Sequence, residues 1–142
     1  MYRENMIKIK LDKGAIAPSR GHNWDAGLDL YAMNDDLIPC GSRRTIDTGI
    51  HIEIPEGYVG YIKSRSGLMV KHGITTDGTI DAHYTGAIRV CLFNHGGIEY
   101  PVKAGDKIAQ LVIHPIALPR LELVDSLEET DRGDNGFGST GR

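Results

Sequence analysis

The sequence predicts an all-β sandwich or barrel with one short helix and an extended C-terminal arm. Short apolar runs rich in β-branched and aromatic residues recur along the chain, each bounded by Gly, Pro, Asn or Asp, as is typical of short strands. No alternation of strands with helices is visible, and this disfavours a doubly wound α/β sheet. The predicted strands lie at residues 6–11, 50–54, 58–62, 88–93, 98–102, 108–113 and 121–124.

The helix is predicted over residues 67–72, which is one or two turns. The glycine-rich phosphate loops of the Rossmann and P-loop folds are absent from the sequence, so phosphate binding would need another device. A length of 142 residues indicates a single domain with a substantial core.

Charge and composition exclude several classes of function. The net charge of −3 provides no basic footprint for duplex nucleic acid, although a few arginines would suffice for a small phosphorylated metabolite. The N-terminus has no apolar signal region, and no run is long enough to span a membrane. Cys40 and Cys91 lack metal-binding spacing. They are interpreted as reduced, partly buried thiols of a cytoplasmic protein.

The C-terminal segment differs from the rest of the chain. Residues 1–124 are expected to form the β domain, whereas residues 125–142 turn acidic and then glycine-rich. Ordering residues 132–142 would cost on the order of 10 kcal/mol, and burying Phe137 would return only about 1.5–3 kcal/mol. Arg132, glycine amides and hydroxyls suit phosphate, and Phe137 suits a flat ring. The arm is therefore predicted to be a flexible flap that a nucleotide orders.

Two segments could bind anions or activate water. Arg65-Ser66-Gly67 opens the predicted helix, where an anion can bind. Taken alone, the segment rather favours a simple Ser cap beside a surface arginine. The Asp77-Gly78 pair predicts a hairpin turn leading to Asp81. In a cleft, Asp81 could be a general base for water; outside one, it is a solvated turn residue.

Two further residues are unusual for their positions. Asp29 is a lone acid within an apolar run, so it should be paired or should serve a metal or a cationic partner. Gln110 is an amide flanked by apolar residues, a pattern that an ordinary polar residue of an edge strand would also show. Each of these signals is weak alone.

Together and in this order, the segments resemble the five motifs of the homotrimeric dUTP pyrophosphatases (dUTPases). The resembling segments are AGLDL from residue 26, RSGL from residue 65, GTIDAHYTG from residue 78, GDKIAQLVI from residue 105 and RGDNGFGSTG from residue 132. The resemblance runs from residue 26 to residue 141, nearly the whole chain.

The resemblance implies a jelly-roll-like barrel assembled as a trimer with three shared active sites. The arm, residues 125–142, would close a site built by the other two subunits. The substrate would be dUTP with Mg²⁺, and water would attack the α-phosphorus to give dUMP and pyrophosphate. Such an enzyme would remove dUTP from the nucleotide pool and supply dUMP, the precursor of dTTP.

The resemblance also implies roles for single residues. Asp81 would activate the water, Tyr84 would exclude a ribose 2′-OH, and Asp29 would support Mg²⁺ through water or hold a partner arginine. The backbone of residues 75–80 would pair with uracil. Phosphates would be held by Arg65, Ser66, Gly67 and Gln110. The base contacts would come from Thr75, Gly78, Thr79 and Ile80, and the arm would contribute Arg132, Phe137, Gly138, Ser139 and Thr140.

Two other functions remain open within this resemblance. The dCTP deaminases share the fold but need a catalytic glutamate near the base, and residues 87–93 contain no acid. Some phage members bind host repressor proteins and often carry inserted segments. In this sequence the corresponding segment, residues 92–106, is short. A host regulatory protein would be an additional partner if the chain is phage-encoded. His83 departs from the Asp or Gly common beside the base.

Overall fold

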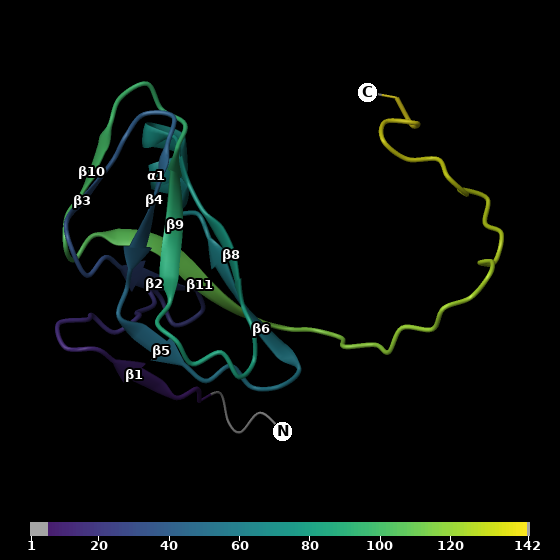
Figure 1. The fold of residues 1–142 in the computed structure, drawn as a ribbon, viewed down its shortest axis with the longest axis horizontal. Helices are drawn as coiled ribbons and strands as arrows, with labels where there is room; N and C mark the ends of the chain where they lie inside the picture. The colour runs from purple at the N-terminus through teal and green to yellow at the C-terminus, as the bar shows by residue number, and fades with distance from the viewer. Residues whose placement is uncertain (1–5, 142) are drawn as a thin grey trace.

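Short antiparallel strands account for nearly all the regular structure of this protein (Figure 1). The computed structural model describes residues 6–141. The strands are β1 (Ile9–Leu11), β2 (Gly27–Tyr31), β3 (Asp36–Ile38), β4 (Arg43–Asp47), β5 (Ile50–Ile52), β6 (Tyr58–Lys63), β7 (Ile74–Thr75), β8 (Asp77–Ile80), β9 (Arg89–Asn94), β10 (Tyr100–Val102) and β11 (Lys107–Pro115). The helix α1 spans Ser66–His72.

The strands form small sheets that wrap one core. The largest sheet has the order β2-β11-β6-β8, a second has the order β4-β9-β7, and two strand pairs, β1-β5 and β10-β3, complete the body. Across residues 6–141 these sheets do not join into a closed barrel, so the predicted all-β, jelly-roll-like architecture is confirmed in its open form. The core is aliphatic and is centred on fully buried Leu30, Ile50, Ile62, Ile88 and Leu111.

Most of the predicted strands occur, some with shorter and some with longer bounds. Strand β1 begins at Ile9 and strand β10 at Tyr100. The predicted strands leave out β2, β3, β4 and β7. The pattern missed β3 and β4 because Asp36–Ile38 and Arg43–Asp47 carry charged side chains among few apolar ones. The strand predicted at residues 121–124 is wrong. Leu121 and Leu123 are almost fully exposed, and a strand needs a neighbour to satisfy its backbone hydrogen bonds.

The hairpin turn predicted at Asp77-Gly78 is also wrong. Both residues lie inside β8, where Gly78 pairs with Ile62 of β6. A Cβ atom on Gly78 would lie 3.2 Å from the Ile62 Cβ, so glycine is needed there for close packing rather than for a turn. The chain changes sheets at buried Thr76, whose backbone N–H and C=O both bond the Ser64 hydroxyl, at 2.9 and 3.0 Å.

The predicted helix is present but is not capped by a serine side chain. Arg65 occupies the N-cap position, and no side chain in the described part of the chain caps the helix. Gly73 ends the helix with a φ of 67°, a left-handed conformation that glycine adopts without strain. The helix has seven residues, and none within residues 6–141 is long and apolar enough to cross a bilayer. Cys40 and Cys91 are free thiols as predicted, although Cys40 is exposed rather than partly buried.

Beyond β11 the chain leaves the body as a long extended arm (Figure 1). Its apolar side chains point into solvent, and Phe137 is fully exposed. Near the end, the backbone forms single turns, such as the bond of 3.0 Å from the Asn135 N–H to the Arg132 carbonyl.

One buried side chain ties three loops of the body together. The Asn94 amide donates to the carbonyls of Ile38 and Ile98, at 3.0 and 2.8 Å, and its oxygen accepts from the Gly96 N–H. The residue is 2% exposed. Losing this amide would leave buried polar groups without partners, and each such group costs about 1–3 kcal/mol.

We therefore expect Asn94→Ala to lower the free energy of unfolding by about 2–4 kcal/mol in a urea titration. Asn34→Ala, at an exposed position, is the matched control and should change it by less than about 0.5 kcal/mol. Equal effects of the two substitutions would contradict the structural role of Asn94.

Candidate active site

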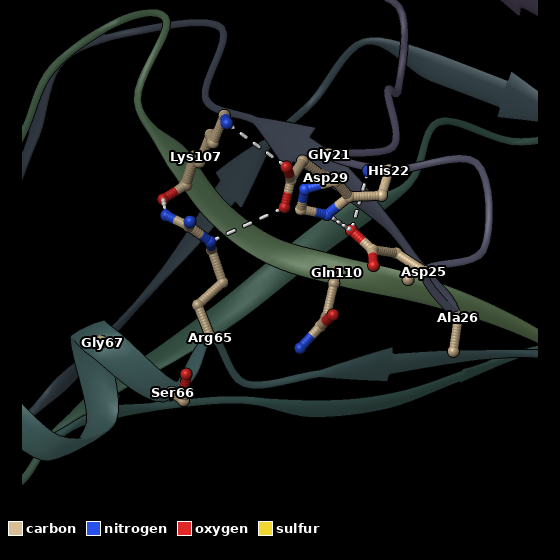
Figure 2. A pocket seen from close by; sticks show the side chains of 11 residues that line it. Gly21, His22, Asp25, Ala26, Asp29, Arg65, Ser66, Gly67, Lys107 and Gln110 are labelled. Carbon is tan, nitrogen blue, oxygen red and sulfur yellow. Dashed lines mark hydrogen bonds and ion pairs between the residues drawn. The ribbon is translucent and has the colours of Figure 1, made fainter.

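A hollow of about 500 Å³ opens where β2, β11 and the start of α1 meet (Figure 2). It contains four of the residues that the sequence singled out for phosphate or metal chemistry, together with Gln110. Its lining comprises Gly21, His22, Asp25, Ala26, Gly27, Asp29, Arg65, Ser66, Gly67, Lys107 and Gln110.

The strand register brings these segments together. In the antiparallel ladders, Gln110 of β11 lies opposite Asp29 of β2 on one side and Lys63 of β6 on the other. Arg65 and Ser66 follow β6 directly at the start of α1. An irregularity in the β2–β11 pairing between Lys107 and Ala109 places Lys107 beside the same acid.

Two cations flank the Asp29 carboxylate (Figure 2). The Arg65 Nε lies 3.7 Å from one carboxylate oxygen, and the Lys107 Nζ lies 3.4 Å from the other. The Arg65 guanidinium also donates to the Lys107 carbonyl at 3.3 Å. The Asp29 side chain is 18% exposed, and a carboxylate so shielded from water requires such partners. Of the roles open for Asp29, the structure favours the holding of cations.

Glycines shape the rest of this hollow. A Cβ atom on Gly27 would collide with the Gln110 side chain, so Gly27 makes room for that amide. The Gln110 Nε2 donates to the Ser64 carbonyl at 3.1 Å. At Gly67, by contrast, an added Cβ would meet no protein atom within 4 Å. Space beside the first amides of a helix is suited to an anion, because those N–H groups lack partners within the helix.

A second, smaller hollow of about 270 Å³ lies beyond the end of β8. It is lined by Thr79, Ile80, Asp81, Tyr84, Ala87 and Arg89. The Asp81 side chain is exposed and Tyr84 is 45% exposed. A carboxylate and an aromatic ring thus face one small open space, as a general base and a platform for a ring would require.

The loop that follows β8 folds back on itself. The Tyr84 N–H bonds the Asp81 carbonyl at 3.2 Å, and the Tyr84 hydroxyl donates to the Ala87 carbonyl at 2.8 Å. A Cβ on Gly86 would lie 2.5 Å from the Tyr84 hydroxyl oxygen, so glycine permits this fold. His83 has a φ of 70°, and its Nε2 lies 2.7 Å from the Glu56 carboxylate.

The structure does not bring all the predicted site residues together. Over residues 6–141 the two hollows have no lining residue in common. Thr75 bonds His95 at 2.9 Å, outside both hollows, and Gly78 lies within β8. The arm residues Arg132, Phe137, Gly138, Ser139 and Thr140 lie in the extended arm and line neither hollow.

Sequence reasoning missed three charged or polar residues of the first hollow. Lys107 lay within the fourth motif-like segment but was not recognised as a partner of Asp29. His22 and Asp25 form a turn at the rim, where both the backbone N–H and the Nδ1 of His22 contact one Asp25 oxygen, at 2.9 and 3.1 Å. Their spacing of three residues was the available signal.

Residues 6–141 contain no group of three or more His, Cys, Asp or Glu side chains arranged to hold a metal ion. In the first hollow, Asp29 is already paired with two cations, and Asp25 contacts His22. Carboxylates are nevertheless present to accept hydrogen bonds from the water shell of a hard cation, which typically keeps several waters.

Comparison with known proteins identifies the relatives of this chain. The dUTPase family model matches residues 13–141. The deoxyuridine 5′-triphosphate nucleotidohydrolase of Clostridium tetani is 48% identical over 143 residues, with 98% of this chain and 99% of the relative covered. A protein of Schizosaccharomyces pombe described as a probable enzyme of the same name is 47% identical over 133 residues, covering 93% and 95%.

Solved structures agree with the sequence relatives. The dUTPase of Staphylococcus bacteriophage 80alpha with dUpNHpp has a TM-score of 0.93 and 32% identity, covering 98% of this chain and all of that one. A variant of the dUTPase from phage phi11 of S. aureus, reported to coordinate a structural Mg(II) ion, has a TM-score of 0.82 and 30% identity, covering 88% and 100%. On these grounds, the chain belongs to the dUTPase family.

Proposed function

We propose that the protein hydrolyses dUTP to dUMP and pyrophosphate with Mg²⁺, through attack of an Asp81-activated water at the α-phosphate. The observation that carries this proposal is the first hollow, in which Asp29 holds Arg65 and Lys107 beside the start of α1. Hydrolysis of dUTP removes it from the nucleotide pool and yields the precursor of dTTP. The sequence relatives that carry this name support the assignment.

The first hollow would bind the triphosphate. Phosphoryl transfer needs positioning and charge neutralisation more than covalent help. Arg65 supplies a fixed guanidinium, Ser66 a hydroxyl, and the space at Gly67 admits a phosphate oxygen near the helix amides. Gln110, whose amide is oriented by the Ser64 carbonyl, would bond the α-phosphate. Lys107 would add a second positive charge.

The second hollow would bind the deoxynucleoside. Asp81 would accept a proton from water as its oxygen attacks phosphorus, while pyrophosphate leaves with the electrons of the broken P–O bond. The Tyr84 ring, held by its hydroxyl, would pack on the deoxyribose and leave no room for a 2′-OH. The backbone of residues 75–80, including Thr75, Gly78, Thr79 and Ile80, would read the uracil edge.

Mg²⁺ fits the chain as an ion carried mainly by the substrate. The paired state of Asp29 leaves it a contact through water rather than a direct bond. When bound to phosphate oxygens, the ion would neutralise charge that develops during the reaction. Arg65, Lys107 and Arg132 would neutralise the remainder.

A shared site in a homotrimer would reconcile the two separate hollows. The phosphate hollow of one subunit would face the Asp81 hollow of the next, and the arm, residues 125–142, would reach over from a third. The extended course of the arm and the exposure of Phe137 support this arrangement. Arg132 would clamp the γ-phosphate, Phe137 would stack on uracil, and Gly138, Ser139 and Thr140 would complete the phosphate cradle. Residue 142 lies outside the described residues.

We further propose a cytoplasmic enzyme that binds neither nucleic acid nor membrane. The free thiols of Cys40 and Cys91 are consistent with a reducing compartment, and the net charge of −3 is unfavourable for nucleic-acid binding.

The role of Asp81 predicts the effect of Asp81→Asn. An amide cannot take up the proton of the attacking water, so kcat should fall by about 10²–10⁴-fold. Binding of a non-hydrolysable dUTP analogue should change by less than about threefold, and Asp125→Asn in the arm is the control carboxylate. A near-normal kcat for Asp81→Asn would exclude the assignment.

Removal of the arm is expected to lower the activity without changing the stability of the protein. Removal of residues 132–142 should lower kcat/KM by about 10²-fold or more, because several charge-assisted bonds of about 1.5–3 kcal/mol are lost. The melting temperature should stay unchanged, since the strands end at Pro115. Arg132→Ala should reproduce much of the defect, whereas Arg120→Ala should not. An unfolded truncation product would instead indicate a structural arm.

Selectivity for deoxyribose provides a third test. Pyrophosphate release from UTP should be about 10–100-fold slower than from dUTP, since forcing extra atoms into a packed space costs about 1–3 kcal/mol. dTTP and dCTP should also be poor substrates. Tyr84→Ala should reduce the UTP discrimination, and Tyr84→Phe, which keeps the ring, should retain it. Equal hydrolysis of UTP and dUTP by the unaltered protein would refute the role of Tyr84.

A further inference from the structure

The loop that carries Asp81 and Tyr84 is not held by strand pairing. Strand β8 ends at Ile80 and β9 begins at Arg89, so residues 81–87 run between sheets. At the end of this loop, the Ile88 N–H bonds the Ile50 carbonyl at 2.8 Å, and the Ile88 carbonyl accepts from the Thr48 hydroxyl at 2.7 Å. The exposed part is held by the Tyr84 contacts within the loop and by side chains from outside it.

His51 supplies one such contact from β5. Its Nδ1 lies 2.7 Å from the Thr85 carbonyl oxygen, one residue beyond Tyr84. Its Nε2 lies 3.0 Å from a carboxylate oxygen of Asp12, which follows β1. The His51 side chain is 21% exposed. The imidazole thus bridges the N-terminal strand and the loop of the proposed base.

The chemistry of this bridge requires a charged ring. A backbone carbonyl and an ionised carboxylate are both acceptors only. A neutral imidazole has one N–H, so it can donate to one of them and must turn a lone pair toward the other. An imidazolium donates to both, and the two short contacts therefore indicate that the bridge is complete only when His51 is protonated.

The surroundings of His51 favour the charged ring on balance. The hydrogen bond to the Thr85 carbonyl, and then that to Asp12, raise the pKa of His51 above its usual value of 6.5. Partial burial and the charge of Lys10, opposite His51 in the β1–β5 ladder, act against this. Lys8 and Glu53 line the same side of β5 and are paired with each other at 3.9 Å. In the loop itself, Asp81 is exposed and His83 pairs with Glu56.

We propose that His51 is a positioning residue for the loop that carries Asp81 and Tyr84. As an imidazolium it ties the Thr85 carbonyl to Asp12 and so fixes the backbone beside both proposed site residues. This inference rests on the proposed hydrolysis of dUTP. It adds a dependence of that reaction on the charge of a residue that lines neither of the two hollows.

The sign of the pH effect follows from the direction of the pKa change. Because bonding raises the pKa of His51 in the folded protein, the bridge is complete below about pH 6.5 and is lost as the pH rises through the raised pKa. The neutral ring would keep its bond to Thr85 and lose that to Asp12. Activity should therefore contain a factor that falls with rising pH, independent of the ionisation of Asp81.

Two variants and one combination isolate this factor. In Asp12→Asn, the new amide can donate to a neutral His51, so the bridge would no longer need the charge. In His51→Gln, the amide nitrogen would donate to one of the two acceptors and the amide oxygen would face the other, so the bridge would break. In the double variant, the amide introduced at position 12 can donate to the amide introduced at position 51, which restores a neutral bridge. His114→Gln is the control, since among residues 6–141 the His114 ring contacts a backbone carbonyl but no carboxylate.

The first experiment measures kcat/KM for dUTP between pH 6 and 9 in all five proteins. The ratio of the unaltered protein to Asp12→Asn should fall by about three- to tenfold across this range, while the ratio to His114→Gln stays constant. His51→Gln should lose about tenfold at pH 6.5 and the double variant should recover most of it. Constant ratios in every comparison, or no recovery, would overturn the proposal.

The second experiment does not depend on turnover. Nuclear magnetic resonance of the 15N-labelled imidazoles should show a pKa of His51 above its usual value of 6.5. Amide hydrogen exchange over residues 84–87 should speed up in His51→Gln and not in His114→Gln. A His51 pKa at or below 6.5, or unchanged exchange, would overturn the bridge even if dUTP is hydrolysed. Failure to hydrolyse dUTP, with both signatures present, would instead refute the proposed function alone.

Discussion

The pairing of β11 with both β2 and β6 is the constraint on which the phosphate hollow depends. This ladder places Gln110 between Asp29 and Lys63, and β6 then delivers Arg65 and Ser66 to the same edge. The buried Leu111 and Ala109 fix which face of β11 points inward, and a slip of one residue would turn Gln110 toward the core. Asp29 and Gln110, which are 81 positions apart in the sequence, therefore meet because the alternation of apolar residues sets the strand register. Their own attraction is not what brings them together.

Charge compensation then makes the hollow stable before a ligand arrives. Two cations close together repel, and a largely buried carboxylate is unfavourable alone. Asp29 between Arg65 and Lys107 relieves both problems and leaves one positive charge on these three groups, which the Asp25 carboxylate in the same lining offsets. A fully ionised triphosphate carries about four negative charges. The hollow by itself is thus under-charged for that ligand, which is the physical reason to expect Mg²⁺ and further arginines from another segment.

Structure could be predicted from the sequence where a local pattern has a single physical cause. Alternating isoleucines predicted β5, and the apolar frame around Asp29 predicted that this acid would need a partner. Prediction failed where a pattern had two physical causes: Asp77-Gly78 is typical of a turn, yet here Gly78 serves close packing against Ile62. Lys107 and Asp12 were missed because their importance arises only from strand register. The predicted strand at residues 121–124 has the right pattern but no neighbouring strand.

In the loop after β8, the residues of the motif differ from the residues that hold the loop in position. Asp81 and Tyr84 lie in a segment without ladder hydrogen bonds, which lets both side chains face solvent and a ligand. That freedom would also permit disorder, because a loop with few buried contacts opens easily. Three contacts limit this disorder: the Tyr84–Ala87 hydrogen bond, the His83–Glu56 contact and the His51 bridge. The chemistry would thus reside in the motif, whereas its geometry depends on residues such as His51 and Asp12 that no motif contains.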